Sequence, residues 1–551
     1  MFSKFHKIFD SLTSKERQIF QTAVLIFVIS SLLNGANLFY KKTILAPIEG
    51  GNYKEGLVGQ PIAINPLIAR NNDVDQSLIS LLFQDVIDLT EKYKVTDNQK
   101  TWTLELKQDI FWSDGEPITS DDIVFTLQTI QNPETHSSLF SIWQGVKAEK
   151  LNEKEVRFIL KTPYAFFLEN LKSLKITPEH IFGTIPAANL RISDYNFEPI
   201  SSGPYQFLSY SKRRDGFINE YHFTENQFFN GGKPLIKNLI FKFYPDYEKA
   251  IDSFNKKEID GLGGLSIADI EKIKIGHQIR KIDIPRYYAI FFNSGTNEIL
   301  KDGNVRSALT LAVDRGKIIT TALRGYGIPI SGPIHPSIEG FLNIEDDIKF
   351  SLDKAKEILD ENNWKIGEDG IAANTIKGNE NKLEFEIIVP EINFLTEAID
   401  IIARDWARIG VKLNPVILSP TEITNEIVKA RNYQMIIFGN ILKTTPDIFS
   451  FWHSSERFHP GLNLGLYENE KVDALLELIR ITNNQSSRIQ AIQELQRIIT
   501  KDKPAIFLFS PDYLYAGPKN LGGFNVKLIA SPTERFEEIN KWYLKTARVF
   551  K

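Results

Sequence analysis

The sequence of 551 residues contains no cysteine. The chain can therefore form no disulfide, no thiolate metal site and no thiol nucleophile. It also lacks the residue to which many exported bacterial proteins attach a lipid anchor. If the chain is exported and held at a membrane, it needs another tether.

An excess of charge of one sign is also missing. The 65 Lys and Arg residues nearly balance the 69 Asp and Glu residues, so the net charge is only -4 and the isoelectric point is near 6.2. Nucleic-acid-binding domains are usually basic, so we expect no nucleic-acid partner. The composition, 42% hydrophobic and 24% charged, is that of a globular protein. A chain this much longer than ~300 residues favours two or three domains over one core.

Familiar catalytic motifs are absent from the sequence. It contains no Gly-x-Ser-x-Gly elbow, no Walker loop, no His-Glu-x-x-His and no Gly-x-Gly-x-x-Gly after a strand. His453 and His459 are close in sequence but lack a third ligand at a telling spacing. We therefore expect a protein that is not an enzyme and that holds neither a cofactor nor a metal.

Long uncharged apolar runs are rare as well, but the sequence has one at residues 19–40. At about 1.5 Å per helical residue, this run can cross a hydrocarbon core of about 30 Å. We therefore predict a transmembrane anchor. A cleaved signal peptide is the alternative, but the run is long for such a peptide and Asn34-Gly35-Ala36 is a poor cleavage site.

The charges around this run predict its orientation. The flanking cations are Lys4, Lys7, Lys15 and Arg17 before it and Lys41 and Lys42 after it. Positively charged flanks usually stay in the cytoplasm. We predict that residues 1–18 are cytoplasmic and that the rest of the chain lies outside the cytoplasm, attached to the cell membrane by a single pass.

The stretch FWSDGEPITSDDIVFTL, residues 111–127, combines three local signals. Trp102, Leu104 and Leu106 alternate before it as in a half-buried strand, and Asp114-Gly115 is a turn pair that ends such a strand. Thr119 has the spacing of a helix cap with an acidic residue three positions later. The stretch therefore predicts a framework of strand, turn and helix rather than a reactive site.

The clearest larger pattern lies at residues 383–439. Apolar strands LEFEIIV, VKLNPVIL and YQMIIFG alternate with two helical segments. Strand-helix-strand order calls for parallel pairing with crossover helices, so this part predicts an α/β lobe. Residues 239–260 show a second pattern of this kind, and the aromatic strand at residues 286–295 is a candidate for crossing between the two lobes. A helix capped by Asn304 is expected to follow it.

These residues resemble the family 5 extracellular solute-binding proteins, the oligopeptide, dipeptide and nickel binders of ABC importers. The stretch at 111–127 is similar to the Trp-x-Asp-Gly signature of that family. Other segments agree in order: PYAFFLENL, ITPEHIF, SSGPYQF, EIDG, YYAIFFN, NVRSALTLAVDRGKII, RGYGIPISGPIHP, PDIFSFWHSS and NLGLYENEKVDALL. Many motifs in the right order are more specific than any single one.

The resemblance implies an α/β fold of the type II periplasmic-binding-protein kind, with two lobes and an inserted third subdomain, preceded here by the transmembrane helix. We expect residues 50–92, 199–285 and 506–551 to form a discontinuous lobe I. Residues 93–198 are expected to form the inserted subdomain and residues 286–505 lobe II.

The implied function is capture without chemistry. Short peptides bind in the cleft between the lobes and are passed to an ABC transporter permease; a monomer is the family expectation. Three alternatives stay open: a binder of another solute such as an oligosaccharide or a metal chelate, a tethered ligand sensor, and a surface hydrolase. The short segment before the anchor leaves the sensor little room for a cytoplasmic domain.

By resemblance, ligand-binding residues come from four places: the loop near Asn52 and Tyr53, the aromatic strand, residues 324–335, and the region of the Pro-Asp turn. The expected residues are Asn52, Tyr53, Tyr287, Tyr288, Asn293, Arg324, Tyr326, His335, Thr444, Asp447 and Trp452. Structural roles are the alternative, because the tyrosines can be core, Arg324 can cap a helix and Trp452 can pack the loop.

One departure concerns the ligand amine. Peptide binders of this kind often place an acidic residue about three positions before the Pro-Asp turn, whereas here Lys443, Thr444 and Thr445 precede Pro446 and Asp447. A buried ammonium without a carboxylate is costly. Either Asp447 takes this role, or the ligand is held through its backbone, or it is not a peptide; our hypothesis is a peptide with Asp447 as its partner.

Overall fold

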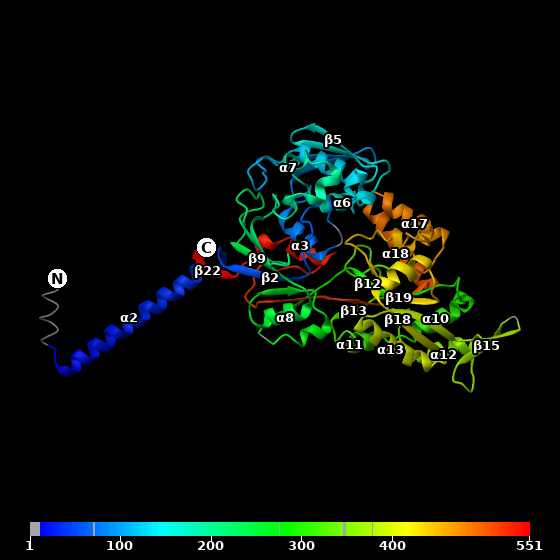
Figure 1. The fold of residues 1–551 in the computed structure, drawn as a ribbon. Coiled ribbons are helices and arrows are strands. Elements are labelled where there is room, and N and C mark those ends of the chain that lie inside the picture. The colour runs from blue at the N-terminus through cyan, green and yellow to red at the C-terminus, as the bar shows by residue number, and fades with distance from the viewer. Residues whose placement is uncertain (1–11, 70–71, 275, 345–348, 377, 551) are drawn as a thin grey trace.

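The computed structural model describes residues 12–69, 72–274, 276–344, 349–376 and 378–550. Helix α2 (Ser14–Lys42) stands away from the body of the molecule, and β1 (Thr43–Ile48) leads from it into the fold (Figure 1). Within the described ranges, α2 is the one helix long and apolar enough to cross a membrane, with a mean hydropathy of 1.8 and none of its apolar window buried. The run predicted from the sequence, residues 19–40, fills most of this helix.

The first large sheet has seven strands in the order β11-β21-β10-β2-β9-β8-β7. Its strands are β2 (Asn52–Val58), β7 (Tyr205–Lys212), β8 (Ile218–Glu225), β9 (Asn238–Tyr244), β10 (Gly261–Gly263), β11 (Gln278–Ile282) and β21 (Tyr513–Gly517). Helices α3 (Asp73–Leu82) and α8 (Tyr247–Asn255) accompany it, with the short turns η8 (Pro532–Phe536) and η9 (Ile539–Lys541). We call this part lobe I.

The inserted subdomain contains a four-stranded antiparallel sheet in the order β3-β4-β6-β5. Its elements are β3 (Thr90–Thr96), β4 (Thr101–Leu106), α4 (Ser120–Gln131), α5 (Phe140–Trp143), β5 (Lys147–Asn152), β6 (Glu155–Ile159), α6 (Phe167–Ser173) and α7 (Glu179–Phe182). The expected cap is present, because Thr119 and Asp122 form a capping box at the start of α4. Buried side chains of the subdomain and of lobe I form one continuous core.

Lobe II is built on a six-stranded sheet in the order β13-β20-β12-β19-β17-β18. Its strands are β12 (Arg286–Phe292), β13 (Gly327–Pro329), β17 (Glu384–Pro390), β18 (Lys412–Leu418), β19 (Met435–Ile441) and β20 (Ala505–Pro511). The strand-helix-strand prediction is confirmed, since β17 pairs in parallel with both β18 and β19. A small three-stranded sheet, β14 (Lys365–Ile366), β15 (Ala372–Ile376) and β16 (Asn379–Lys382), lies beside it.

Helices cover both faces of the lobe II sheet. They are α10 (Gly303–Leu311), α11 (Arg315–Thr321), α12 (Leu352–Glu361), α13 (Asn393–Ala407), α14 (Pro420–Glu422), α15 (Val428–Ala430), α16 (Phe449–Trp452), α17 (Glu470–Ile481) and α18 (Gln485–Asp502). The predicted cap of α10 is wrong: Asp302, not Asn304, caps it, because its carboxylate accepts the Asn304 N–H at 2.8 Å.

Two short stretches connect the lobes. Residues 283–285 link β11 to β12, and Asp512 links β20 to β21. They run side by side, because Ser510 Oγ donates to the Ile284 carbonyl at 3.2 Å and Arg286 Nη2 donates to the Pro511 carbonyl at 3.3 Å. The crossing therefore lies just before the aromatic strand β12, which itself belongs to the lobe II sheet.

The start of the last lobe I segment also differs from the expected residue 506. Strand β20 pairs with β12 and β13 of lobe II, and all seven of its residues are buried. A strand that is apolar on both faces needs cover on both sides, which the layered lobe II supplies. The chain therefore enters lobe I only after Pro511.

A buried ion pair joins distant segments inside lobe I. Arg535 Nη2 lies 3.2 Å from Glu55 Oε1, and the two side chains are 2% and 0% exposed. Tyr515 donates its hydroxyl to the same carboxylate at 2.8 Å, and burial raises the Glu55 pKa while Arg535 opposes that rise. Gly261 of the EIDG motif passes so close that an added Cβ would lie 2.2 Å from Glu55 Oε2. The glycine is needed because β10 pairs with β2 and places Gly261 directly opposite Glu55.

His335 is held neutral in the core of lobe II. It is 1% exposed, next to the buried Ile334, and its Nδ1 accepts the Ser337 backbone N–H at 3.2 Å. Burial lowers the His335 pKa to about 4. Protonation of this side chain is therefore coupled to unfolding.

We expect Arg535→Met to destabilise the protein by about 3–5 kcal/mol, because it leaves the buried Glu55 carboxylate without its cation. The loss should be smaller at pH 5 than at pH 8, since protonated Glu55 needs no partner. Unfolding measurements on this variant, on Glu55→Gln and on the double variant give the coupling energy. The matched control is Arg213→Met, which breaks the exposed ion pair with Asp215 and should change the free energy of unfolding little. If the effects of Arg535→Met and Glu55→Gln add up in the double variant, the two side chains are not coupled.

The second prediction concerns acid stability. The unfolded chain protonates His335 near its ordinary pKa of about 6.5, so the stability that this residue contributes is complete above that pH and falls as pH drops toward 4. Between pH 7.5 and pH 5.0 the natural protein should lose about 2 kcal/mol that His335→Gln does not lose. Unfolding curves of both proteins at the two pH values measure this difference, and an identical pH response would rule the coupling out.

Candidate functional site

A cleft of about 2170 Å³ lies between lobe I, the inserted subdomain and lobe II. Lobe I contributes one face of α3, from Asp73 to Ser80, and residues 530–541. The subdomain contributes residues 141–146 and 160–175. Lobe II contributes residues 441–451 and one face of α17. This volume is well above the several hundred Å³ typical of sites for small molecules and leaves room for an extended ligand.

Exposed apolar side chains enter the cleft from the subdomain and lobe II. Ile142, Ile441, Leu462 and Ile481 line it, and each keeps between 39% and 59% of its surface exposed. Such side chains can receive apolar parts of a ligand, because covering them removes apolar surface from water.

At one end of the cleft, the subdomain contacts lobe II through Tyr164, Asp447 and Arg480, which we call the latch. The Tyr164 hydroxyl donates to Asp447 Oδ2 at 2.8 Å, and Arg480 Nε lies 3.1 Å from the same oxygen. The Arg480 guanidinium also lies 4.3 Å from the centre of the Phe449 ring. The Asp447 carboxylate is therefore neutralised by a cation and already accepts three hydrogen bonds, the third from the Phe449 N–H to Oδ1 at 3.3 Å.

The chain after Tyr164 completes this latch. The Ala165 N–H donates to the Arg480 carbonyl at 2.7 Å. Phe166 is only 7% exposed and packs in a core cluster of lobe II, although it belongs to the subdomain. The Arg488 guanidinium lies 5.6 Å from its ring centre. The latch therefore combines apolar burial with directed polar contacts, and it joins the lobes at a place separate from the two crossings.

The lobe I wall is acidic. Burial raises the Glu537 pKa to about 7, with Glu534 and Asp85 adding to the rise and Lys175 opposing it. Burial likewise raises the Asp85 pKa to about 6, although Lys175 Nζ is 3.5 Å from its carboxylate. Glu534 accepts the Ala530 N–H at 2.6 Å, which fixes the loop that carries this wall. With its pKa raised to about 7, the Glu537 carboxyl is partly protonated near neutral pH, and a cationic group beside it would favour its ionised form.

Of the eleven residues expected at the site, Thr444 and Asp447 line the cleft. They follow β19, where the loop of the Pro-Asp turn starts.

The structure places five of the others in cores. Tyr53, Tyr287 and Trp452 are 0% exposed, and Asn293 and His335 are 1% exposed. The Tyr287 hydroxyl accepts hydrogen bonds from Asn440 Nδ2 at 2.9 Å and from Trp452 Nε1 at 3.2 Å. Asn293 donates to the Arg431 carbonyl at 2.8 Å. These contacts hold the core together and leave little surface for a ligand.

The remaining four lie outside the cleft lining. Asn52 accepts a hydrogen bond from Asn238 on the neighbouring strand at 2.9 Å, and Tyr288 packs its ring against Phe394 and Phe509. Arg324 forms an ion pair with Glu271. Tyr326 packs against a lobe I core cluster, and Lys281 Nζ lies 4.6 Å from its ring centre.

Sequence reasoning missed most of the residues that line the cleft. The segments 141–146 and 530–541 carry no motif that marks them, and they reach the cleft only through the tertiary fold. One signal was available, because residues 441–447 follow the carboxyl end of the parallel strand β19. Ligands of open α/β sheets commonly bind at such strand ends.

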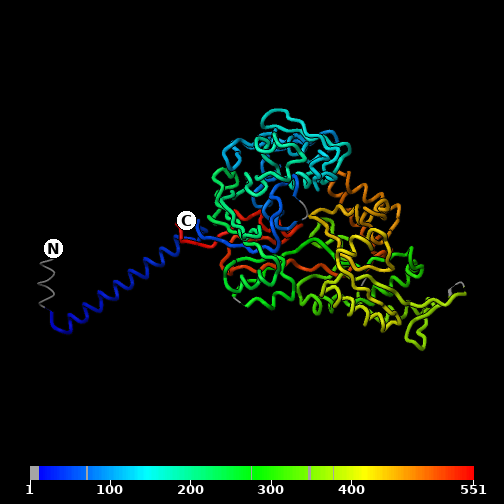
Figure 2. Tube along the Cα trace, in the orientation of Figure 1, coloured from blue at the N-terminus to red at the C-terminus, as the bar shows by residue number. Residues whose placement is uncertain are grey.

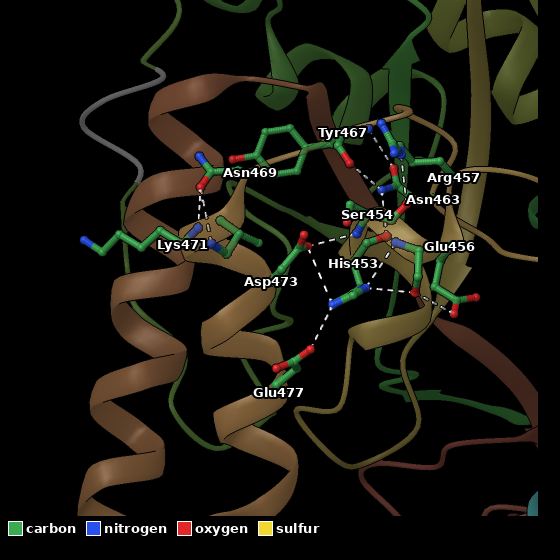
Figure 3. Close-up of polar contacts among 12 residues, drawn as sticks. His453, Ser454, Glu456, Arg457, Asn463, Tyr467, Asn469, Lys471, Asp473 and Glu477 are labelled. Atoms are coloured by element: carbon green, nitrogen blue, oxygen red, sulfur yellow. Dashed lines mark hydrogen bonds and ion pairs between the residues drawn. The ribbon is translucent and has the colours of Figure 1, made fainter.

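His453, one of the two histidines considered for a metal site, lies against α17. Its Nε2 is 3.9 Å from Asp473 Oδ1 and 3.6 Å from Glu477 Oε1, as Figure 3 shows. Its Nδ1 accepts the Ser455 N–H at 3.1 Å, so the neutral ring carries its proton on Nε2, facing the carboxylates. In the described part of the chain, no three His, Cys, Asp or Glu side chains gather as metal ligands.

Several known proteins are similar to this chain in sequence over most of its length. The oligopeptide-binding protein AppA of Bacillus subtilis is 26% identical over 527 residues, which are 92% of this chain and 94% of AppA. The dipeptide-binding protein of Escherichia coli is 24% identical over 445 residues, 76% of this chain and 80% of that protein.

Among solved structures, AppA of Bacillus subtilis in complex with a nonapeptide has a TM-score of 0.67 at 25% identity and covers 91% of this chain and 100% of its own. The ABC transporter substrate-binding protein CtaP of Listeria monocytogenes has a TM-score of 0.77 at 24% identity and covers 90% of this chain and 99% of its own. The fold is therefore the expected two-lobe type. The family model for bacterial extracellular solute-binding proteins, family 5 Middle, matches residues 86–458, more than half of the chain. This chain belongs to the family 5 bacterial extracellular solute-binding proteins.

Proposed function

We propose that this protein is a membrane-anchored substrate-binding protein that captures short peptides outside the cytoplasm and delivers them to an ABC transporter permease. The observation that carries the proposal is the cleft of about 2170 Å³ with walls from both lobes. Relatives named for oligopeptide and dipeptide binding support peptides as the ligand class. The apolar helix α2 supports the anchor.

Capture needs no chemical step. A ligand that contacts both lobes stabilises the closed arrangement by its difference in affinity for the closed and open states. The two crossings at residues 283–285 and Asp512 are the hinge about which the lobes close. An extended peptide can bond to exposed backbone such as residues 443–445, while its side chains meet the apolar residues of the cleft.

The role of Asp447 follows from its partners. A ligand amine would compete with both Tyr164 and Arg480 for one carboxylate. We therefore favour Asp447 as a latch residue that stabilises the closed state over Asp447 as the receptor of a free amine. The acidic lobe I wall, with Glu537, is where a cationic end of the ligand would meet negative charge.

Mass spectrometry of small molecules released by denaturing the purified protein tests the ligand class. A ladder of short peptides is expected, because a large cleft with scattered apolar contacts selects little among side chains. One sugar or one metal chelate would replace the peptide proposal while leaving capture in place, and steady turnover of a bound ligand would contradict a purely binding role. If the cleft is empty, thermal shift with a peptide library replaces the first measurement, since saturation at 100 times the Kd adds about 2.7 kcal/mol.

Latch variants test the closed state. We expect Tyr164→Phe to weaken peptide binding about fivefold, because losing one hydrogen bond to a carboxylate removes about 1 kcal/mol from the closed arrangement. Calorimetry with one peptide, unblocked and N-acetylated, measures this loss. Tyr195→Phe, the same change at a tyrosine that is 41% exposed outside the cleft, is the control.

The two peptides also separate the two roles of Asp447. If Asp447 acts in the latch, Asp447→Asn weakens both peptides equally, as Tyr164→Phe does. If it binds the ligand amine, Asp447→Asn weakens only the unblocked peptide. The second result would overturn the latch role and restore the amine hypothesis.

A further inference from the structure

The end of helix α2 and the strand pair β1–β22 carry a group of side chains that the cleft does not use. Strand β22 (Lys545–Phe550) is the last strand of the fold, and it lies beside the end of α2 (Figure 2). We call this group the collar; its members are Tyr40, Ile44, Leu45, Arg548, Val549 and Phe550.

The joint between helix and fold is tight. Helix α2 ends at Lys42 and β1 begins at Thr43, with no residue between them. All six residues of β1 pair with β22, from Thr43 opposite Phe550 to Ile48 opposite Lys545. Thr43 is 3% exposed; its hydroxyl donates to the Phe39 carbonyl at 2.5 Å and accepts Arg548 Nη1 at 3.2 Å. The helix therefore continues into a paired ribbon rather than into a flexible linker.

Strand β22 also packs against the helix itself. The Arg548 guanidinium lies 3.9 Å from the centre of the Tyr40 ring, and Phe550 meets Phe39 edge to face at 6.1 Å. Two segments about 500 positions apart in sequence thus meet at the level where the apolar helix ends.

The collar exposes large apolar side chains. Phe550 is 72% exposed, Leu45 63%, Ile44 48% and Val549 39%. These residues lie on β1 and β22, beside a helix end that carries Tyr40, Lys41 and Lys42. Aromatic rings next to cations are typical of the boundary between hydrocarbon and water, where the rings sit among headgroups and the cations face lipid phosphates.

We propose that the collar lies in the headgroup layer of the membrane that α2 spans, with Arg548, Lys41 and Lys42 facing anionic phospholipids. The inference rests on the proposed anchor and extends it, because it gives the distant strand β22 a place in the membrane. The partner is the lipid surface, since the exposed apolar side chains of the collar lie directly beside the end of the apolar helix α2. A ribbon of six residues is about 20 Å long at ~3.3 Å per residue, so lobe I is held within about that distance of the bilayer.

The lack of cysteine makes a direct test possible in the full-length chain. Single cysteines replace Val549, Phe550, Ile29 in mid-helix and Ile192, which is 80% exposed on the subdomain, and each carries a spin label. The protein is reconstituted into vesicles of phosphatidylglycerol and phosphatidylcholine. Collisions of each label with oxygen, which concentrates in the bilayer, and with a water-soluble nickel chelate report its depth.

We expect the Val549 and Phe550 labels to give oxygen-to-nickel ratios several-fold above that of Ile192 and below that of Ile29. Arg548→Glu should lower the ratio at Val549, and more so as the phosphatidylglycerol content rises. Equal ratios at Val549, Phe550 and Ile192, with Ile29 still in the bilayer, would overturn the collar and leave the anchor intact. An Ile29 label in water would overturn both. Thermal unfolding of each labelled protein confirms that it has kept its fold.

Discussion

The buried Glu55–Arg535 pair is the contact on which the arrangement of lobe I depends. Glu55 sits on β2, at the start of the folded body, and Arg535 sits in η8, near its end. Glu534 and Glu537 lie on either side of Arg535 in the sequence, and both line the cleft. Because a buried charge without its partner is very costly, the pair fixes the path of residues 530–541 and thereby positions the acidic wall. One interaction in the core thus shapes a wall of the cleft.

The lobes are joined by two kinds of contact with different roles. The crossings at residues 283–285 and Asp512 are covalent and short, so they set the axis of any closing motion. The latch of Tyr164, Asp447 and Arg480 is noncovalent and partly exposed. Contacts of that kind contribute about 1 kcal/mol each, which is enough to shift a closing equilibrium without locking it. A ligand that adds contacts inside the cleft can then decide the balance.

Sequence patterns predicted the framework well and the site poorly, for one physical reason. Parallel pairing of β17, β18 and β19 and the Thr119 cap follow from local periodicity and hydrogen bonding. Whether an aromatic residue faces a core or a cleft depends on which segments fold over it. Tyr287 and Tyr164 are alike in sequence, but the first is buried by β20 and α16, and the second lies at the cleft. The acidic wall was invisible for the same reason, since Glu537 and Asp85 meet only in the folded lobe.

Helix α2 is connected to the cleft through lobe I. Helix α2 continues into β1, which pairs with β22, and both strands adjoin lobe I segments at β2 and η9. Lobe II is connected to the helix through lobe I, by the two crossings and by the latch on the inserted subdomain. If the collar fixes the ribbon at the membrane surface, lobe I stays in one orientation and closure moves lobe II. A permease in the same membrane would then contact lobe I in one fixed orientation. The position of lobe II relative to the permease would differ between the ligand-bound and ligand-free protein.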